Sequence, residues 1–296
     1  ITVEGKMNYI VDEKTVEGQV KGYKESVNLV GTTSADNIKL FLFNSKADFV
    51  IEEVYFAGST TPEGKQYLAD QYIKIYNNSD SVLYADGLVI LESAFKTSQK
   101  YDYTPDIMSR AMAVQCVYAI PGNGKDYPVQ PGKSLLICDK AIDHREANSN
   151  SFDLSNADFE WFDDSDKNPD IDNPQVTNLD KIYSYTKTTW SLHNQGLCAY
   201  AIARLQVDKN TFLTDYTYKA TYINVIGESQ DKNAYQVPNA WIIDAVNISN
   251  KAQYAWNVVD ASLDMGFTYC GEVALDKNRY NKSVRRKVLS TTPDGR

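Results

Sequence analysis

The densest group of oxygen ligands in the sequence lies in an acidic segment, residues 153–172, which holds eight acids and a single base. Ca²⁺ takes about six to eight oxygen ligands, and closely spaced Asp and Asn side chains supply them. The match to a calcium loop ends at Pro169, where that loop requires glycine. We expect a solvated acidic loop and no cofactor, with one alternative, a calcium site at Asp164, Asp166 and Asn168.

Aromatic side chains in and after the acidic segment form a second candidate site. Flat rings on a long loop can stack on sugar faces or anchor a protein partner, since Trp and Tyr dominate binding hot spots. Core packing of the same loop explains these rings equally well, so both interpretations stay open. Trp241 and Trp256 lie in apolar runs and are expected in the core. The candidate binding residues are Trp161, Phe162, Tyr183, Tyr185 and Trp190.

The sequence contains no familiar catalytic motif. It has two histidines, His144 and His193, and no GxSxG, HExxH, Walker or GxGxxG pattern. Successive side chains of a strand point to opposite faces, so Asp143 is not expected to orient His144, and Glu52 and Glu53 are expected to face opposite ways. Two carboxylates about 5 to 9.5 Å apart could hydrolyse a glycoside, but sequence does not reveal such a separation. We predict no catalytic residues.

The overall charge makes nucleic acid an unexpected partner. The chain carries 30 basic and 39 acidic residues, a net charge of −9, and such a field repels polyanions. Basic residues gather in the last twenty positions, 277–296, where we expect a solvated surface that could approach the acidic segment. This basic group includes the run Arg285, Arg286 and Lys287. No apolar run reaches the roughly 18 residues of a membrane span, so no transmembrane segment is predicted.

The cysteines are predicted to be small buried hydrophobes. Each stands in an apolar stretch, and their spacing contains no CxxC pair that would suggest zinc. Disulfide pairing is the alternative, and the sequence leaves it open. The four residues are Cys116, Cys138, Cys198 and Cys270.

Short runs of β-branched and aromatic residues predict a mainly β protein. Gly, Pro and Asn turns separate these runs, as the strands of a two-sheet stack require. We expect one short helix near 142–147. Two long regions, 144–182 and 206–238, show no regular pattern, and they are either functional loops or secondary structure too polar to recognise. The predicted strands span 37–44, 48–56, 71–77, 81–93, 113–120, 133–139, 197–205 and 240–246.

From residue 48 on, the order of segments resembles a lamin-tail-type immunoglobulin-like domain. The segments are FVIEEVYFAG, QYIKIYNNSDSVLYADGLVI and PVQPGKSLLICDKA. In that pattern a strand ends in a Tyr-Asn turn, here Tyr76 and Asn77, and a glycine, here Gly87, opens the next strand. Lys74 departs from the pattern, which generally has an acid there. The resemblance implies an immunoglobulin-like, lamin-tail-like β-sandwich with long loop insertions.

The chain also resembles an uncharacterised family of exported or outer-surface proteins of Bacteroidetes. The shared segments are FVIEEVYFAG, YIKIYNNSD, PGKSLLICDKAIDH, SNSFDLSNADFEW, WIIDAV and SVRRK. In that family such a domain follows a small carboxypeptidase-regulatory-like β-sandwich. The resemblance implies that residues 1–46 are the C-terminal part of that small domain and that residues 47–296 are the lamin-tail-like domain. It also implies an exported lipoprotein at the outer membrane or cell surface, with a lipid anchor upstream of Ile1.

Together these observations predict a non-catalytic binding or accessory protein at the cell surface. The partner would be a protein or a glycan, and the resemblance points to an outer-membrane nutrient-uptake receptor. One alternative is a glycan hydrolase that uses two carboxylates. Another is a structural spacer without a ligand, which would have no concave site.

Overall fold

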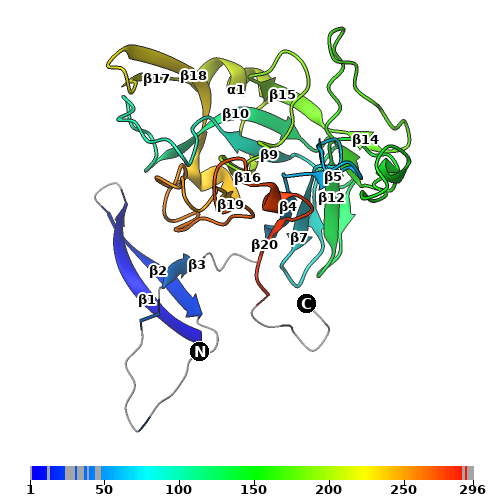
Figure 1. Cartoon of the computed structure of the whole chain (residues 1–296). Coiled ribbons are helices and arrows are strands. Elements are labelled where there is room, and N and C mark those ends of the chain that lie inside the picture. Colours follow the sequence, from blue (N-terminus) through cyan, green and yellow to red (C-terminus); the bar gives the residue numbers. More distant parts are fainter. Residues whose placement is uncertain are drawn as a thin grey trace.

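The N-terminal strands form a sheet of their own in the structure, a computed structural model (Figure 1). The structure describes residues 2–11, 14–23, 31, 37, 38, 40–43, 48–288 and 291. The sheet has the antiparallel order β1-β2-β3, with β1 (Thr2–Val11), β2 (Lys14–Tyr23) and β3 (Phe41–Phe43). The strand predicted at 37–44 is β3. The assignment of residues 1–46 to a separate domain stays a prediction.

Two larger sheets pack face to face and make up the body of the protein (Figure 1). The seven-stranded sheet has the order β17-β18-β10-β9-β16-β19, with β15 also paired to β10. Its strands are β9 (Leu88–Ser93), β10 (Ala111–Ala119), β15 (Asp180–Ser184), β16 (Ala199–Arg204), β17 (Thr217–Ile223), β18 (Ser229–Pro238) and β19 (Ile242–Asn247). All its pairings are antiparallel.

The six-stranded sheet has the order β14-β13-β12-β7-β4-β20. Its strands are β4 (Phe49–Tyr55), β7 (Tyr72–Asn77), β12 (Ser134–Cys138), β13 (Phe159–Glu160), β14 (Thr177–Asn178) and β20 (Val284–Arg285). The pairs β12–β13 and β13–β14 are parallel. Smaller elements are β5 (Ser59–Thr60), β6 (Gln66–Tyr67), β8 (Leu83–Tyr84), β11 (Pro128–Val129), α1 (Lys209–Asp215), and the short 3₁₀ helices η1 (His144–Glu146), η2 (Asn239–Trp241) and η3 (Lys277–Arg279).

The central strands alternate between two cores, as the two-residue period of a strand dictates. On β9, Leu88 and Ile90 face the six-stranded sheet, whereas Val89 and Leu91 belong to the core on the other face. On β16 the outer face carries only small side chains, which let loops and α1 approach the sheet closely. These are Ala199, Ala201 and Ala203.

The prediction of a mainly β protein is confirmed, and the eight predicted strands all contain observed strands. Gly87 has φ +69°, a backbone angle that glycine adopts easily, and it divides the predicted run 81–93 into β8 and β9. The helix predicted near 142–147 is η1, a single 3₁₀ turn. The region 144–182 is largely irregular, with β13, β14 and the start of β15 inside it.

The interpretation of 206–238 as a functional loop is wrong, and the alternative, secondary structure too polar to recognise, is confirmed. The region contains α1, β17 and β18, which extend the larger sheet (Figure 1). Its polar composition hid the pattern, because one face of the hairpin is exposed. On β17 the buried Tyr218 and Ala220 alternate with exposed neighbours such as Lys219.

The expectation that Glu52 and Glu53 face opposite ways is also wrong. A β-bulge interrupts the register of β4 between Ile51 and Glu53, so strict alternation fails there. Both carboxylates lie near the Arg285 guanidinium, at 3.9 Å from Glu52 and 3.5 Å from Glu53. The Tyr72 hydroxyl also donates to Glu53 at 3.0 Å. Both acids help to attach β20 to the sheet.

Candidate functional site

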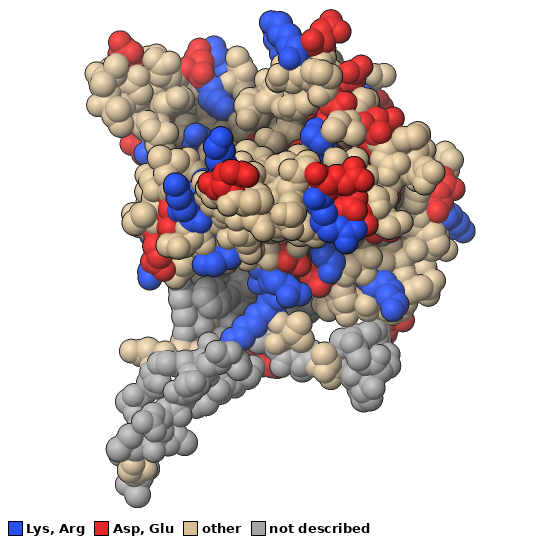
Figure 2. Space-filling view, turned by 45° about the vertical axis from the view of Figure 1, so that its right-hand side comes forward, with Lys and Arg blue, Asp and Glu red and all other residues tan. Residues whose placement is uncertain are grey.

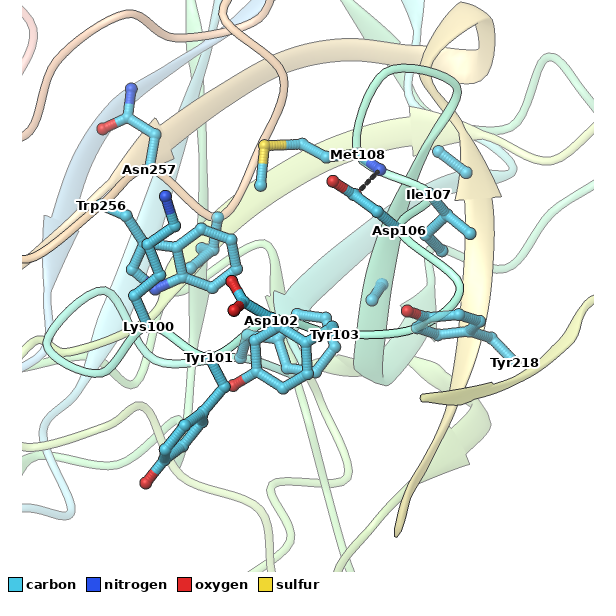
Figure 3. Close-up of a pocket in the computed structure, with 14 residues that line it drawn as sticks. Lys100, Tyr101, Asp102, Tyr103, Asp106, Ile107, Met108, Tyr218, Trp256 and Asn257 are labelled. Atoms are coloured by element: carbon cyan, nitrogen blue, oxygen red, sulfur yellow. Dashed lines mark hydrogen bonds between the residues drawn. The ribbon is translucent and has the colours of Figure 1, made fainter. Parts of the chain in front are cut away.

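A cavity of about 560 Å³ lies on the outer face of the seven-stranded sheet (Figure 3). The loop 94–110 between β9 and β10 encloses it together with β17 and the segment 256–258. Two backbone hydrogen bonds between Thr104 and Thr221, each 2.9 Å long, attach the loop to β17. The N–H of Ala255 donates to the Thr97 carbonyl at 2.9 Å and holds the third element in place.

The cavity is lined by part of an outer aromatic cluster, defined as Phe95, Tyr101, Tyr103, Tyr222 and Trp256. The Tyr103 ring lies nearly parallel to Phe95, with centroids 3.8 Å apart, and to Trp256, with centroids 5.7 Å apart. Tyr222 stacks on Tyr101 at 4.7 Å. Offset stacking of this kind is favourable beyond the area it buries. The rings therefore hold one another in fixed orientations beside an open space.

Hydrogen bonds fix two of the lining rings further. The Trp256 indole N–H donates to the carbonyls of Lys96 and Gln99, at 2.9 and 3.0 Å. The Tyr218 hydroxyl donates to the Pro105 carbonyl at 2.7 Å. Burial raises the pKa of Tyr103 and of Tyr218, so both phenols are neutral at physiological pH.

Polar groups stand among the rings. In Figure 3, Lys100 and Trp256 lie on one side of the cavity and Asp106 and Tyr218 on the other. One carboxylate oxygen of Asp106 accepts the Met108 N–H at 2.9 Å and serves the local turn. Within the described chain, neither Asp102 nor Asp106 forms an ion pair with a Lys or Arg. The site thus combines apolar ring surface with unpaired carboxylates, the composition of a pocket for a small polar ligand.

Two of the predicted binding aromatics are core residues instead. Trp161 and Trp190 are 0% and 1% exposed, so core packing is the interpretation that holds for these two rings. With Tyr118 they form an inner aromatic cluster between the two sheets. Trp190 stacks on Tyr118 at 4.9 Å and lies 5.1 Å from Trp161.

The other three predicted aromatics are more accessible, but they lie outside the lining of the cavity. Phe162 and Tyr183 are half-buried, and Tyr183 packs on Tyr235 with centroids 4.4 Å apart. Tyr185 is 52% exposed, and the Lys232 ammonium lies 5.9 Å from its ring centroid. Tyr185 is therefore the one member of the predicted group that presents a substantial ring surface to solvent.

The acidic segment is only partly the solvated loop that we expected. Asp163 is buried and accepts hydrogen bonds from the Tyr118 hydroxyl at 2.8 Å and the Trp190 N–H at 2.7 Å, and it pairs with Lys181 at 2.6 Å. Asp170 pairs with Lys140. Asp163 and Asp170 therefore anchor the loop to the sandwich.

The candidate calcium ligands remain exposed. Asp164, Asp166 and Asn168 all lie at the surface. In the part of the chain that the structure describes, no three His, Cys, Asp or Glu side chains come close enough together to hold a metal ion. The calcium site at Asp164, Asp166 and Asn168 stays a prediction.

His144 takes part in a buried hydrogen-bond arrangement around η1. Its Nε2 lies 2.9 Å from the Lys140 carbonyl, which only accepts, so Nε2 carries the proton. Nδ1 then accepts from the Tyr67 hydroxyl at 2.9 Å. Burial lowers the pKa of His144 and lowers that of His193 to about 4, so both rings are neutral at pH 7.

The cysteines are free thiols, and three of them are buried as predicted: Cys116, Cys138 and Cys198. Cys270 is half-buried. Burial raises the pKa of all four, to about 11 for Cys270. The thiols are therefore protonated and unreactive at neutral pH.

Charged groups are interspersed on the face shown in Figure 2, with no extended area of one sign. Two residues of the basic C-terminal run have acidic partners, since Arg286 pairs with Asp244 at 2.5 Å and Arg285 lies near Glu52 and Glu53. The ion pairs of the acidic segment are with Lys140, Lys181 and Arg145 instead. Across the described residues, no helix is both long and apolar enough to cross a membrane.

Sequence analysis missed the residues that line the cavity. Trp256 was expected in the core, but it is half-buried and faces the cavity. The available signal was the run Lys100 to Asp106, KYDYTPD, in which aromatic and acidic residues alternate outside any predicted strand. The site could not be recognised from this run alone, because Tyr218 and Trp256 lie more than a hundred residues further along the chain.

The fold and the cavity define a two-layer β-sandwich protein with an outer aromatic pocket. This pocket is the cavity that Phe95, Tyr101, Tyr103 and Trp256 line on the outer face of the larger sheet. A family model described as "Protein of unknown function (DUF4876)" matches residues 130–296, more than half of the sequence. The chain therefore belongs to the DUF4876 family. The expected likeness to an uncharacterised family is confirmed at this level.

A solved structure supports the same assignment of fold. The crystal structure of a DUF4876 family protein from Bacteroides thetaiotaomicron VPI-5482 is similar, with a TM-score of 0.67 and 24% sequence identity. The match covers 99% of this chain and 75% of that one. A search of curated proteins finds no match.

Proposed function

We propose that this chain is a non-catalytic binding protein and that the outer aromatic pocket binds a glycan. The observation that carries the proposal is the cavity of about 560 Å³ beside the stacked rings of Tyr103 and Trp256. Small-ligand pockets have volumes of about 300 to 1,000 Å³ and combine apolar walls with a few polar groups. Sugars match this lining, because their rings present C–H faces to aromatic rings and hydroxyls to polar side chains.

Preorganisation supports the same function. The indole of Trp256 is already held by two hydrogen bonds, and Tyr103 is stacked between neighbours. Rings that are fixed before binding lose little conformational freedom when a ligand arrives, which improves affinity. The cavity also weighs against the spacer alternative, since a spacer needs no concave site.

The wider setting of the proposal is the bacterial cell surface. We propose an exported, lipid-anchored protein with an immunoglobulin-like, lamin-tail-like sandwich that works beside an outer-membrane nutrient-uptake receptor. The segments quoted above, from FVIEEVYFAG to SVRRK, support this setting. The Bacteroides origin of the similar structure is consistent with a bacterial protein.

The test is a titration of the full chain with neutral oligosaccharides, in which calorimetry and tryptophan fluorescence measure binding. Trp256→Ala should weaken binding at least about tenfold, as loss of a central aromatic contact does. Tyr185→Ala is the matched control, because its exposed ring lies outside the cavity, and it should bind like the parent. Loss of binding in Tyr185→Ala alone would move the site to the loop. No binding up to about millimolar concentration would reject the function.

The glycan hydrolase alternative keeps one specific observation in its favour, since Asp102 and Asp106 line the same cavity. Two carboxylates beside a bound sugar are the minimum for hydrolysis. Incubation with the oligosaccharide that binds, followed by assay of new reducing ends, separates the two functions. Turnover that disappears in Asp102→Asn or in Asp106→Asn would establish the enzyme, and bound but intact sugar would support the binding protein.

A further inference from the structure

We infer that the outer aromatic pocket selects glycans that carry free, protonated amino groups over neutral glycans of the same backbone. The inference rests on the proposed function and names the class of sugar that the pocket takes. It depends on the charges of the lining and on the chemistry of the rings.

The charged side chains of the lining favour a cation. Asp102 and Asp106 supply two carboxylates, and Lys100 supplies one ammonium group. Both acids are exposed, and no Lys or Arg of the described chain forms an ion pair with either. A cationic ligand group would provide the missing partner, whereas an anionic ligand would meet two carboxylates.

The position of Lys100 leaves the acids available. Figure 3 shows Lys100 beside Trp256, while Asp106 lies across the cavity near Ile107 and Met108. The lysine stem is long and flexible, so its ammonium can move toward solvent when a cation binds. Its charge does not cancel both carboxylates.

The aromatic lining acts in the same direction. Trp and Tyr rings attract ammonium groups through the negative potential of their faces, and Trp does so most strongly. Trp256, Tyr101 and Tyr103 line the same cavity as Asp102, and Figure 3 shows Asp102 between Trp256 and Tyr103. The net charge of −9 adds a weak long-range attraction for cations. Rings and carboxylates together form a site in which a sugar ring stacks while its ammonium group meets a carboxylate.

The experiment compares three oligosaccharides of equal length and the same β-1,4 linkage, built from glucosamine, N-acetylglucosamine or glucose. Calorimetry of the full chain at about pH 6 keeps the free amine protonated. We expect the glucosamine oligomer to bind about tenfold more tightly than the other two, the size of an exposed ion pair together with a cation–π contact. The advantage should shrink in about 1 M NaCl, because salt screens exposed charges.

Two double variants with the same change in charge locate the effect. Asp102→Asn with Asp106→Asn should remove the preference for the amine, so that the glucosamine oligomer binds no more tightly than the two neutral oligomers. Asp80→Asn with Asp180→Asn changes two exposed acids outside the cavity and should keep the preference. Unfolding curves of both variants check that they fold.

The outcomes separate this inference from the proposed function. Equal or weaker binding of the glucosamine oligomer, with neutral oligomers still bound, would overturn the amine preference alone. A preference that persists in the Asp102→Asn, Asp106→Asn variant would overturn it too, since the general charge of the chain would then be the cause. Failure of all three oligomers to bind would remove the proposed function as well.

Discussion

The inner and outer aromatic clusters use similar side chains for different purposes. Both combine Trp and Tyr rings with carboxylates. In the inner cluster Trp190 and Tyr118 surround Asp163, which is buried and fully engaged in hydrogen bonds and an ion pair. In the outer cluster Trp256 and Tyr103 border a cavity, and the nearby Asp102 is exposed. Coverage by a second sheet, and not residue type, therefore decides whether a group of aromatic and acidic side chains becomes part of the core.

The largest effect on stability should come from the inner cluster. Trp190→Ala removes a fully buried ring and also its indole N–H, which donates to Glu92 at 3.3 Å. We expect a loss of about 4 kcal/mol in the free energy of unfolding, typical of a large aromatic truncation in a core. Urea unfolding measures it. A loss below about 1 kcal/mol would show that the core tolerates the space left by the Trp190 ring, and it would contradict the difference from the outer cluster.

The acidic segment offers a contrast between adjacent residues. Asp163→Asn leaves the Lys181 ammonium without its partner and weakens two buried hydrogen bonds, so we expect a loss of about 3 kcal/mol. Asp164→Asn alters an exposed neighbour and should stay within about 0.5 kcal/mol of the parent. Thermal and urea unfolding of the two variants test the pair. Equal losses in both would mean that the buried contacts of Asp163 add nothing.

The pH dependence of the free energy of unfolding should reveal the titration of Glu92, which is buried between the two sheets. Burial raises the pKa of Glu92 from 4.5 to about 7, although Gln115, Trp190 and Tyr200 donate hydrogen bonds to its carboxylate. A raised pKa in the folded state favours the protonated form. The free energy of unfolding therefore includes a contribution of about 3 kcal/mol from Glu92 below about pH 4.5. This contribution is lost as the pH rises through about 7.

Glu92→Gln removes this titrating group and serves as the reference. Asp139 is also buried, with its pKa raised to about 8, and contributes in the same direction in both proteins. The difference between the two curves therefore isolates Glu92. Urea unfolding at about pH 5, 6, 7 and 8 should show a steeper decline in the parent than in the variant. Parallel curves would contradict the assignment of a raised pKa to Glu92.

Truncation of a ring in the outer cluster should cost much less stability than truncation of a ring in the inner cluster. Trp256→Ala removes a half-buried ring that stacks on Tyr103, and we expect a loss of about 1 kcal/mol. Measured beside Trp190→Ala, it sharpens the comparison, because the outer variant should lose ligand binding while keeping most of its stability. A loss as large as that of Trp190→Ala would mean that the outer ring is a core residue as well.

Local pattern was enough to predict most of the strands. The alternation of Ile73 and Ile75 with Lys74 follows from the two-residue period of a half-buried strand, and the Asn77 turn ends β7 as its side-chain bonding predicts. The strands β17 and β18 were not recognised from sequence, because one face of their hairpin is exposed and polar. The bulge at Glu52 was not predicted, because it depends on how β4 pairs with the neighbouring strand β7.

The candidate site was much harder to predict than the strands. Trp161 and Trp256 both have acidic residues within a few positions along the chain, yet one is sealed between sheets and the other borders a cavity. Nothing near either residue in the sequence records which segments cover it. The closing contacts, such as the one between Thr104 and Thr221, join positions more than a hundred residues apart.

The β character of this chain, its turns and its overall charge follow from sequence alone, because each depends on neighbours along the backbone or on composition. Tertiary structure decided which aromatic rings and which acids remain open to a ligand. That choice depends on how two sheets and their loops stack in space, and burial is a property of the assembled layers.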